Sequence, residues 1–199
     1  MELSAAIALI SNDHLWPQGK AAWADLGCGN GLFTFALASL LAPGSTIYAV
    51  DKNVVRLDPS LPIKDVEIKT LKLDFVSAEL PLKRLDGILM ANSLHYVQDK
   101  LALIQKLSDC LQPNGRFLIV EYDTDTPVPH WVPYPVSFHS LQSLFADAGF
   151  TNVHRLGEDV WSAGLQIEYA AACHGGLNWA SALLGFQKLN IFVGIKRKK

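Results

Sequence analysis

The stretch Ala24-Asp25-Leu26-Gly27-Cys28-Gly29-Asn30-Gly31 decides the fold of this chain. An apolar run, Ala21 to Ala24, leads into it, and a helix-like apolar run, Leu32 to Leu41, follows it. This order predicts a strand, a glycine-rich turn and a helix, which together present backbone N–H groups to a nucleotide-like ligand at a helix N-terminus. The spacing differs from the dinucleotide pattern Gly-x-Gly-x-x-Gly, because position 32 is leucine. The glycine spacing therefore disfavours a dinucleotide cofactor.

The composition is that of a globular protein with one core. The chain has 199 residues, half of them apolar, and we expect 1–199 to form a single domain with residues 1–17 as an N-terminal helical cap. The net charge of −2 provides no field that favours nucleic acid, and no apolar run is long enough for a membrane span. Cys28, Cys110 and Cys173 are far apart and form neither a disulfide framework nor a metal-ligand spacing, so we expect no metal and a cytoplasmic location.

Strand and helix patterns alternate along the chain. This alternation predicts an α/β fold with a doubly wound, mostly parallel sheet and helices on both faces. The predicted strands are 21–26, 46–50, 66–73, 85–90, 117–120 and 153–156, and the predicted helices are 31–41, 101–111 and 141–148. Pro113-Asn114-Gly115 is predicted to end the second of these helices. Two segments, 165–172 and 190–195, compete to be a further strand, and residues 175–199 receive no single assignment.

Acidic residues stand at the ends of three predicted strands, where open α/β sheets bind their ligands. Asp51 can accept hydrogen bonds from both hydroxyls of a ribose. Asp74 can accept from the exocyclic amine of adenine, with Phe75 packed near the ring. Asp25 suits a ligand that carries an ammonium or sulfonium group. Each carboxylate also has a simpler explanation, since Asp51 and Asp74 can cap strand ends and Asp25 can tie down the loop backbone.

Five motifs stand in the order that they have in a known family. They are Asp25-Leu26-Gly27-Cys28-Gly29-Asn30-Gly31, Val50-Asp51, Leu73-Asp74-Phe75, Leu85-Asp86-Gly87-Ile88-Leu89-Met90-Ala91-Asn92 and Leu111-Gln112-Pro113-Asn114-Gly115-Arg116. Over residues 15–155 the chain resembles the S-adenosylmethionine-dependent methyltransferases with a Rossmann-like (class I) fold, of the small-molecule type. The resemblance implies a seven-stranded sheet whose last strand is antiparallel, and S-adenosylmethionine as the cofactor.

The resemblance also implies the contacts of that cofactor. The loop 27–31 would wrap the methionine part, Asp51 would bind the ribose, Asp74 with Phe75 would bind the adenine, and backbone near Asn92 would contact the amino group. The predicted cofactor site comprises Asp25, Gly27, Cys28, Gly29, Gly31, Asp51, Lys52, Asp74, Phe75 and Asn92.

His95 is the predicted general base. In the resembling fold the segment 92–96 lies near the cofactor sulfur, and imidazole titrates near neutral pH. The alternative is a structural histidine that caps the next helix.

The loop after the fifth strand roofs the acceptor pocket in the resembling fold. Its aromatic and imidazole side chains predict a site for a planar or apolar small molecule, at Tyr122, His130, Trp131 and Tyr134. For Trp131 and Tyr134 the alternative is that they pack the loop onto the domain.

These patterns predict methyl transfer from S-adenosylmethionine to a small-molecule acceptor by in-line displacement. In such a reaction the protein aligns nucleophile and methyl group and excludes water, so no nucleophilic side chain is needed. Besides another transfer from the same sulfonium, such as aminopropyl transfer, two other functions stay open. One is an NAD-dependent oxidoreductase, which the glycine spacing disfavours, and the other is a non-catalytic cofactor-binding domain, which a turnover assay separates from an enzyme.

Overall fold

The computed structural model describes residues 1–11, 19–58, 65–159 and 189–196 of the protein. The helices in this part of the chain are α1 Leu3–Ile10, α2 Leu32–Leu40, α3 Lys100–Ser108 and α4 Phe138–Asp147. The strands are β1 Ala22–Leu26, β2 Thr46–Asp51, β3 Glu67–Lys72, β4 Leu85–Ala91, β5 Leu111–Tyr122, β6 Phe150–Asp159 and β7 Leu189–Lys196. These elements confirm the predicted α/β fold with a mostly parallel sheet. The competing segment 165–172 lies outside the described residues.

The described strands form one sheet in the order β3-β2-β1-β4-β5-β7-β6. The pairs from β3 through to β5 are parallel, whereas β7 runs antiparallel to both β5 and β6. The chain moves outward from β1 to β2 and β3, and then returns to place β4 on the other side of β1. The connections therefore diverge between β1 and β4, and their divergence leaves room for a ligand at the carboxyl ends of these strands.

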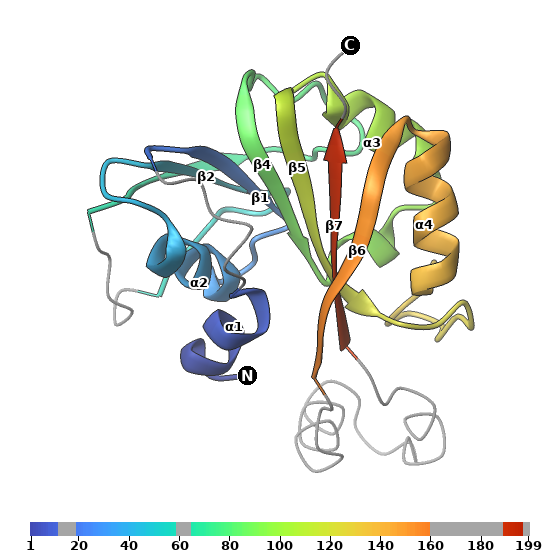
Figure 1. The fold of residues 1–199 in the computed structure, drawn as a ribbon. Coiled ribbons are helices and arrows are strands. Elements are labelled where there is room, and N and C mark those ends of the chain that lie inside the picture. Colours follow the sequence, from blue (N-terminus) through green and yellow to red (C-terminus); the bar gives the residue numbers. More distant parts are fainter. Residues whose placement is uncertain (12–18, 59–64, 160–188, 197–199) are drawn as a thin grey trace, which may run out of the picture.

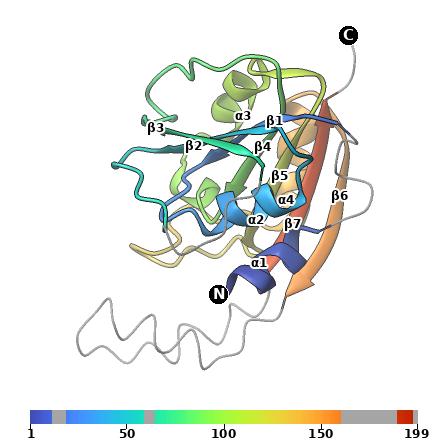
Figure 2. The same ribbon diagram turned by 90° about the vertical axis from the view of Figure 1, so that its left-hand side faces the viewer.

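Helices cover both faces of the sheet, as Figures 1 and 2 show. Trp23 and Leu89 belong to the apolar layer under α1 and α2, whereas Ala24 and Ile88 belong to the layer under α3 and α4. Neighbouring residues separate in this way because successive side chains of a strand point to opposite faces. Both faces of the central strands are thus buried, which explains the apolar runs in β1, in β4 and at residues 117–120 of β5.

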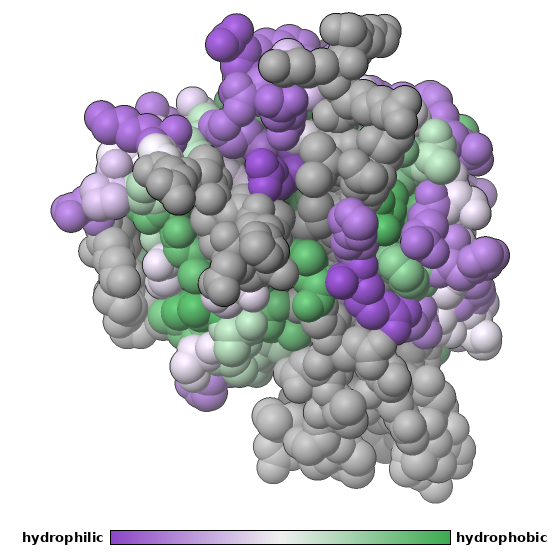
Figure 3. Space-filling model, in the orientation of Figure 1, coloured by the Kyte–Doolittle hydropathy of each residue, from purple (hydrophilic) through white to green (hydrophobic). Residues whose placement is uncertain are grey.

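In Figure 3, the surface over α1 and α2 carries hydrophobic residues, whereas the coloured residues at the top of the view are mostly hydrophilic. Helix α1 buries Ala6 and Ile10 in the layer that it shares with α2. None of the helices in the described part of the chain has the length and apolar character needed to span a bilayer.

Two predicted boundaries were wrong, namely the end of the helix predicted at 101–111 and the start of the strand predicted at 117–120. Helix α3 ends at Ser108, and β5 begins at Leu111 instead of residue 117. Leu85 pairs with Leu111 and Gly87 pairs with Arg116, so Pro113-Asn114-Gly115 forms an irregularity inside the strand and not a helix stop. The side chain of Asp86 supports this irregular part of the strand, because its carboxylate accepts hydrogen bonds from the Ala22 N–H and from the Gln112 amide. This tertiary support lets a turn sequence continue a strand.

Candidate functional site

The glycine loop lies between β1 and α2, and its backbone needs glycine. Gly27, Gly29 and Gly31 have φ values of 81°, 54° and 91°, in the left-handed region that favours glycine. The N–H groups of Gly27 and Cys28 both donate to the Val50 carbonyl, at 2.8 and 3.1 Å, which fastens the loop to β2. A Cβ on Gly27 would lie 2.5 Å from the Ser93 Cβ, whereas a Cβ on Gly29 would meet nothing within 4 Å. The loop is therefore tightly packed at Gly27 and open at Gly29.

Asp25 is buried directly below this loop. Asp25 is only 1% exposed, and its carboxyl accepts a 2.6 Å hydrogen bond from the Thr34 hydroxyl on α2. Burial raises the pKa of the Asp25 carboxyl from 3.8 to about 7, against the lowering effect of the Thr34 hydrogen bond, and the Asp51 charge raises it further. The contact with Thr34 fixes the loop to the helix, and the buried carboxylate would gain from a cation placed nearby.

We expect the fold to lose stability as Asp25 ionises. Because the folded-state pKa of this acid lies above its unfolded value, the folded protein binds more protons than the unfolded chain between pH 4 and about 7. The free energy of unfolding therefore falls as pH rises through this window, by up to about 1.4 kcal/mol per pH unit from this group. In Asp25→Asn the side-chain amide oxygen can still accept from Thr34, but the side chain no longer has an ionisable proton.

Urea unfolding of wild type and Asp25→Asn from pH 5 to 8 measures this contribution. The wild type should lose about 2 kcal/mol relative to the variant between pH 5 and 7. Asp65→Asn, which alters an exposed acid, is the control and should track the wild type. Parallel stability curves for wild type and Asp25→Asn would contradict the assignment.

Asp51 and Lys52 follow β2 beside the loop. The two oxygens of Asp51 accept hydrogen bonds from the Gly29 N–H at 3.1 Å and from the Asn53 N–H at 2.8 Å. Asp51 thus caps its own turn and also reaches the open part of the glycine loop. Lys52 is exposed, and its charge helps to lower the pKa of Asp74. The end of β2 is in this way joined to both the loop and the turn after β3.

Asp74 and Phe75 form the start of a turn after β3. Hydrogen bonds from the Val76 N–H at 3.0 Å and the Ser77 hydroxyl at 2.9 Å hold the pKa of the Asp74 carboxyl below its ordinary value. Phe75 is buried, and its Cε1 would lie 3.9 Å from a Cβ on Gly27. The structure therefore brings the Phe75 ring to the glycine loop, while exposed Asp74 caps the turn.

Asn92 directly follows β4 and has a left-handed backbone, with a φ of 52°, and its N–H donates to the Val120 carbonyl. Its side-chain oxygen is buried and has no hydrogen-bond partner among the described residues. Buried polar atoms in native proteins are nearly always paired, so such an acceptor marks a place where a ligand can donate.

His95 forms a buried pair with a residue that sequence reasoning missed. His95 is 2% exposed and its Nδ1 lies 2.7 Å from Oε2 of Glu121, which is 1% exposed. The other Glu121 oxygen accepts from the N–H groups of Leu94 and His95, at 2.8 and 3.2 Å. Nε2 of His95 is buried and has no partner among the described residues. The signal in the sequence was an acid at the end of the apolar run of β5.

The proposed capping role of His95 does not match this geometry. His95 lies in a short 3-10 helix, Leu94–Tyr96, and α3 is capped instead by Asp99, which accepts from the Ala102 N–H at 3.0 Å.

The predicted acceptor residues gather beside His95 with one exception. The ring of buried Tyr122 lies 6.1 Å from that of His95 and 6.0 Å from that of Trp131. Tyr134 donates its backbone N–H to the His95 carbonyl at 3.0 Å, and its side chain is 40% exposed. His130 is exposed in the turn closed by the bridge between Val128 and Val132. The rings of Tyr122 and Trp131 thus follow that of His95 in succession, and Tyr134 is joined to His95 through its backbone.

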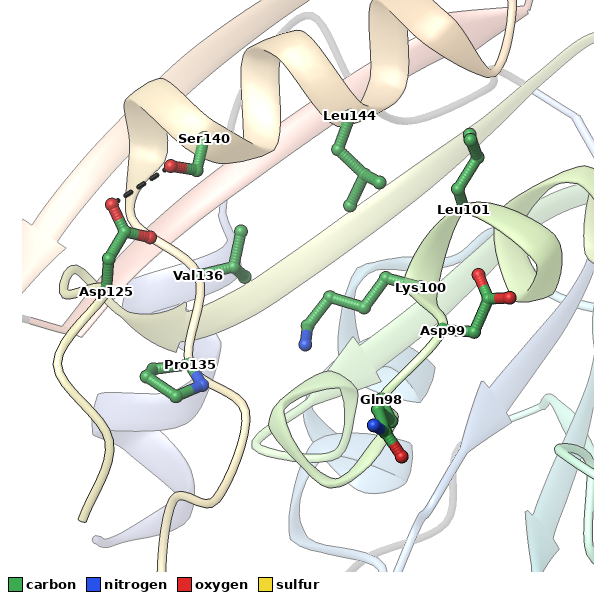
Figure 4. Close-up of a pocket in the computed structure, with 9 residues that line it drawn as sticks. All are labelled: Gln98, Asp99, Lys100, Leu101, Asp125, Pro135, Val136, Ser140 and Leu144. Carbon is green, nitrogen blue, oxygen red and sulfur yellow. Dashed lines mark hydrogen bonds between the residues drawn. The ribbon is translucent and has the colours of Figure 1, made fainter.

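A cleft of about 680 Å³ lies elsewhere, between the N-terminus of α3 and the start of α4 (Figure 4). Its polar groups include Lys100, which donates to the Val97 carbonyl, and Asp125, which accepts from the Ser140 hydroxyl. It is lined by none of the predicted site residues. Within the described ranges, no three His, Cys, Asp or Glu side chains are grouped to hold a metal ion.

Cys28 and Cys110 are buried. Burial raises the pKa of the Cys28 thiol to about 12 and raises that of the Cys110 thiol as well. Both therefore stay protonated at neutral pH, which fits packing roles and not nucleophilic ones.

Comparison with known proteins places this geometry in a family. The family model described as "Methyltransferase domain" matches residues 3–155. An uncharacterized methyltransferase of Mycobacterium tuberculosis is 29% identical over 112 residues, which cover 56% of this chain and 56% of that protein. The chain thus aligns with about half the length of the curated relatives that it matches first.

Solved structures share the fold across nearly the whole chain. The YcgJ protein of Bacillus subtilis has a TM-score of 0.59 and 15% identity, covering 99% of this chain and 98% of that one. The 1,6-didemethyltoxoflavin-N1-methyltransferase of Burkholderia thailandensis, crystallised with 1,6-didemethyltoxoflavin and S-adenosylhomocysteine, has a TM-score of 0.64 and 17% identity, covering 98% and 78%. Because the family model spans most of the chain, this protein belongs to the methyltransferase-domain family and has the Rossmann-like fold of the class I, S-adenosylmethionine-dependent members.

Proposed function

We propose that this protein transfers the methyl group of S-adenosylmethionine to a small-molecule acceptor by in-line displacement. The observation that carries the proposal is the set of groups at the carboxyl ends of β1 and β4. Asp25 lies in β1 and Gly29 in the loop after β1, whereas Asn92, whose side-chain oxygen has no partner among the described residues, follows β4, the strand that pairs with β1 at the switch point. The Burkholderia enzyme, which shares the fold, was crystallised with S-adenosylhomocysteine, and this supports the choice of cofactor.

The residues at this edge fit the parts of that cofactor. Asp51 offers its carboxylate to the ribose hydroxyls, and Phe75 offers an apolar surface to the adenine. The Asn92 oxygen can accept from the ammonium of the methionine part, and buried Asp25 supplies a negative charge when it is ionised. Gly29 lets the backbone approach closely, because no side chain intervenes. When bound, the cofactor supplies a methyl group on a sulfonium centre.

We assign His95 as the general base and Glu121 as the residue that positions it. The carboxylate of Glu121 holds the proton of the neutral imidazole on Nδ1, so that Nε2 keeps a free lone pair. That lone pair can take a proton from an acceptor hydroxyl, phenol or ammonium as the methyl group is transferred. Tyr122, Trp131 and Tyr134 would pack against the acceptor and exclude water.

Isothermal titration with S-adenosylmethionine and S-adenosylhomocysteine tests the cofactor. We expect binding in the micromolar range, which is ordinary for enzyme ligands. The absence of binding at millimolar ligand would overturn the proposed function. Turnover, measured as S-adenosylhomocysteine formed with a panel of small protic acceptors, distinguishes an enzyme from a non-catalytic binding domain.

Asp51→Ala should weaken S-adenosylmethionine binding by about a hundredfold, because two charge-assisted hydrogen bonds to the ribose are lost. Titration calorimetry of the variant measures the loss, and a thermal melt without ligand checks that the fold persists. Glu67→Ala, at the opposite end of the neighbouring strand β3, removes a similar charge and should bind like the wild type. Wild-type affinity in Asp51→Ala would remove Asp51 from the site.

A further inference from the structure

The ammonium of Lys106 is enclosed by three backbone carbonyls of one turn. Its Nζ lies 2.8 Å from the Phe75 oxygen, 2.7 Å from the Val76 oxygen and 3.1 Å from the Ala78 oxygen. An ammonium has three N–H donors, so these contacts use all of them. Lys106 stands on α3, some 30 residues further along the chain, and its side chain therefore crosses between two separate elements to reach the turn.

The same turn is held at its other end by Asp74. The carboxylate accepts from the Val76 N–H and the Ser77 hydroxyl, and the Ala78 N–H donates to the Asp74 carbonyl at 2.9 Å. An anion thus lies at the N–H end of the turn and a cation at its carbonyl end, in agreement with the direction of the peptide dipoles. The segment 73–84 contains no strand or helix that would otherwise hold the turn in place.

Fixing this turn fixes the Phe75 ring. Phe75 is 8% exposed and lies beside Gly27, at the floor of the glycine loop. A shift of the turn would move the ring and the Asp74 carboxylate together. We propose that Lys106 is a positioning residue, which holds the turn 74–78 in the conformation that receives the adenine of the cofactor. This inference rests on the proposed function, since adenine recognition is part of it.

Lys106 also stands in the last turn of α3, where a cation stabilises a helix C-terminus. A purely structural role there would affect α3 and the stability of the fold, without a selective effect on the turn or on adenine. The test must therefore report on the turn and on the ligand separately.

The experiment compares wild type, Lys106→Met, Lys106→Arg and the control Lys83→Met, which removes the charge of an exposed lysine. The first readout is native-state amide hydrogen exchange without ligand. We expect Lys106→Met to speed the exchange of amides 75–78 at least about tenfold and to leave the amides of α3 unchanged. Faster exchange in α3 with an unchanged turn would overturn the proposal.

The second readout is calorimetric binding of S-adenosylhomocysteine and of 5′-methylthioadenosine, which carries the adenine and lacks the amino-acid part. Lys106→Met should weaken both ligands by the same factor, about tenfold, with partial rescue in Lys106→Arg and none of the loss in Lys83→Met. Unchanged affinity, or a loss for S-adenosylhomocysteine alone, would overturn the positioning role. If the wild type binds neither ligand, the proposed function itself fails, and the exchange data still show whether Lys106 holds the turn.

Discussion

Replacing Glu121 with glutamine should lower turnover at least about a hundredfold and destabilise the fold by about 3 kcal/mol. Three donors converge on the two carboxylate oxygens, namely the N–H groups of Leu94 and His95 and the Nδ1 of His95. A glutamine has only one acceptor oxygen, so its NH₂ must face at least one of these donors. If it faces Nδ1, the imidazole must accept there and carry its proton on Nε2, which leaves the base without a lone pair.

Two measurements test this prediction. Turnover at saturating cofactor gives the effect on catalysis, and urea unfolding gives the effect on stability. Glu79→Gln, which makes the same change at an exposed position, should leave both quantities unchanged. Because Glu121 acts through His95, His95→Gln should abolish the same share of turnover, and the double variant should lose no more than either single one. Additive losses in kcat would show that the two residues do not act as a pair.

Gly27→Ala should destabilise the fold by about 3 kcal/mol and reduce cofactor affinity more than a hundredfold. The backbone there has a φ of 81°, and the added Cβ would lie 2.5 Å from the Cβ of Ser93. Ser93 cannot yield easily, because its hydroxyl donates to the Leu26 carbonyl at 2.7 Å in the buried end of β1. The loop itself must therefore move, and with it the backbone that the cofactor approaches.

Gly29→Ala distinguishes the two causes of the lost stability, which are the left-handed backbone strain and the contact of the new Cβ with Ser93. Its φ of 54° imposes a similar left-handed strain, and its Cβ would meet no atom within 4 Å. We expect it to destabilise the fold by only about 1 kcal/mol in a denaturant titration. Equal destabilisation in the two variants would mean that the contact with Ser93 is relieved at little cost.

The structure places the predicted strand-end acids where the sequence pattern put them, and their roles toward a ligand stay predictions. Asp25 and Asp51 follow apolar residues, Asp74 follows the alternating strand β3, and in a parallel sheet such strand ends meet at one edge. The structure brings Asp51 to Gly29 and Phe75 to Gly27, so residues more than 20 positions apart converge as the pattern indicated. What the pattern did not reveal is that Asp25 is buried enough for its pKa to rise to about 7.

Glu121 and Lys106 were missed for the same physical reason. Each acts on a segment far along the chain: Glu121 on the N–H groups and imidazole of 94–95, and Lys106 on the carbonyls of 75, 76 and 78. A carboxylate at a strand end and a lysine in the last turn of a helix look ordinary when only their neighbours in sequence are visible.

By itself, the sequence determined the α/β alternation, the position of the glycine loop and the acids at the strand ends. These features follow from local hydrophobic periodicity and from the conformations that only glycine adopts easily, and both act over a few residues. The tertiary structure alone decided that Pro113-Asn114-Gly115 continues a strand, that Glu121 faces His95 and that Lys106 closes on a distant turn. Those contacts depend on which strands become neighbours, and burial then gives each one its strength because water no longer competes for the same hydrogen bonds.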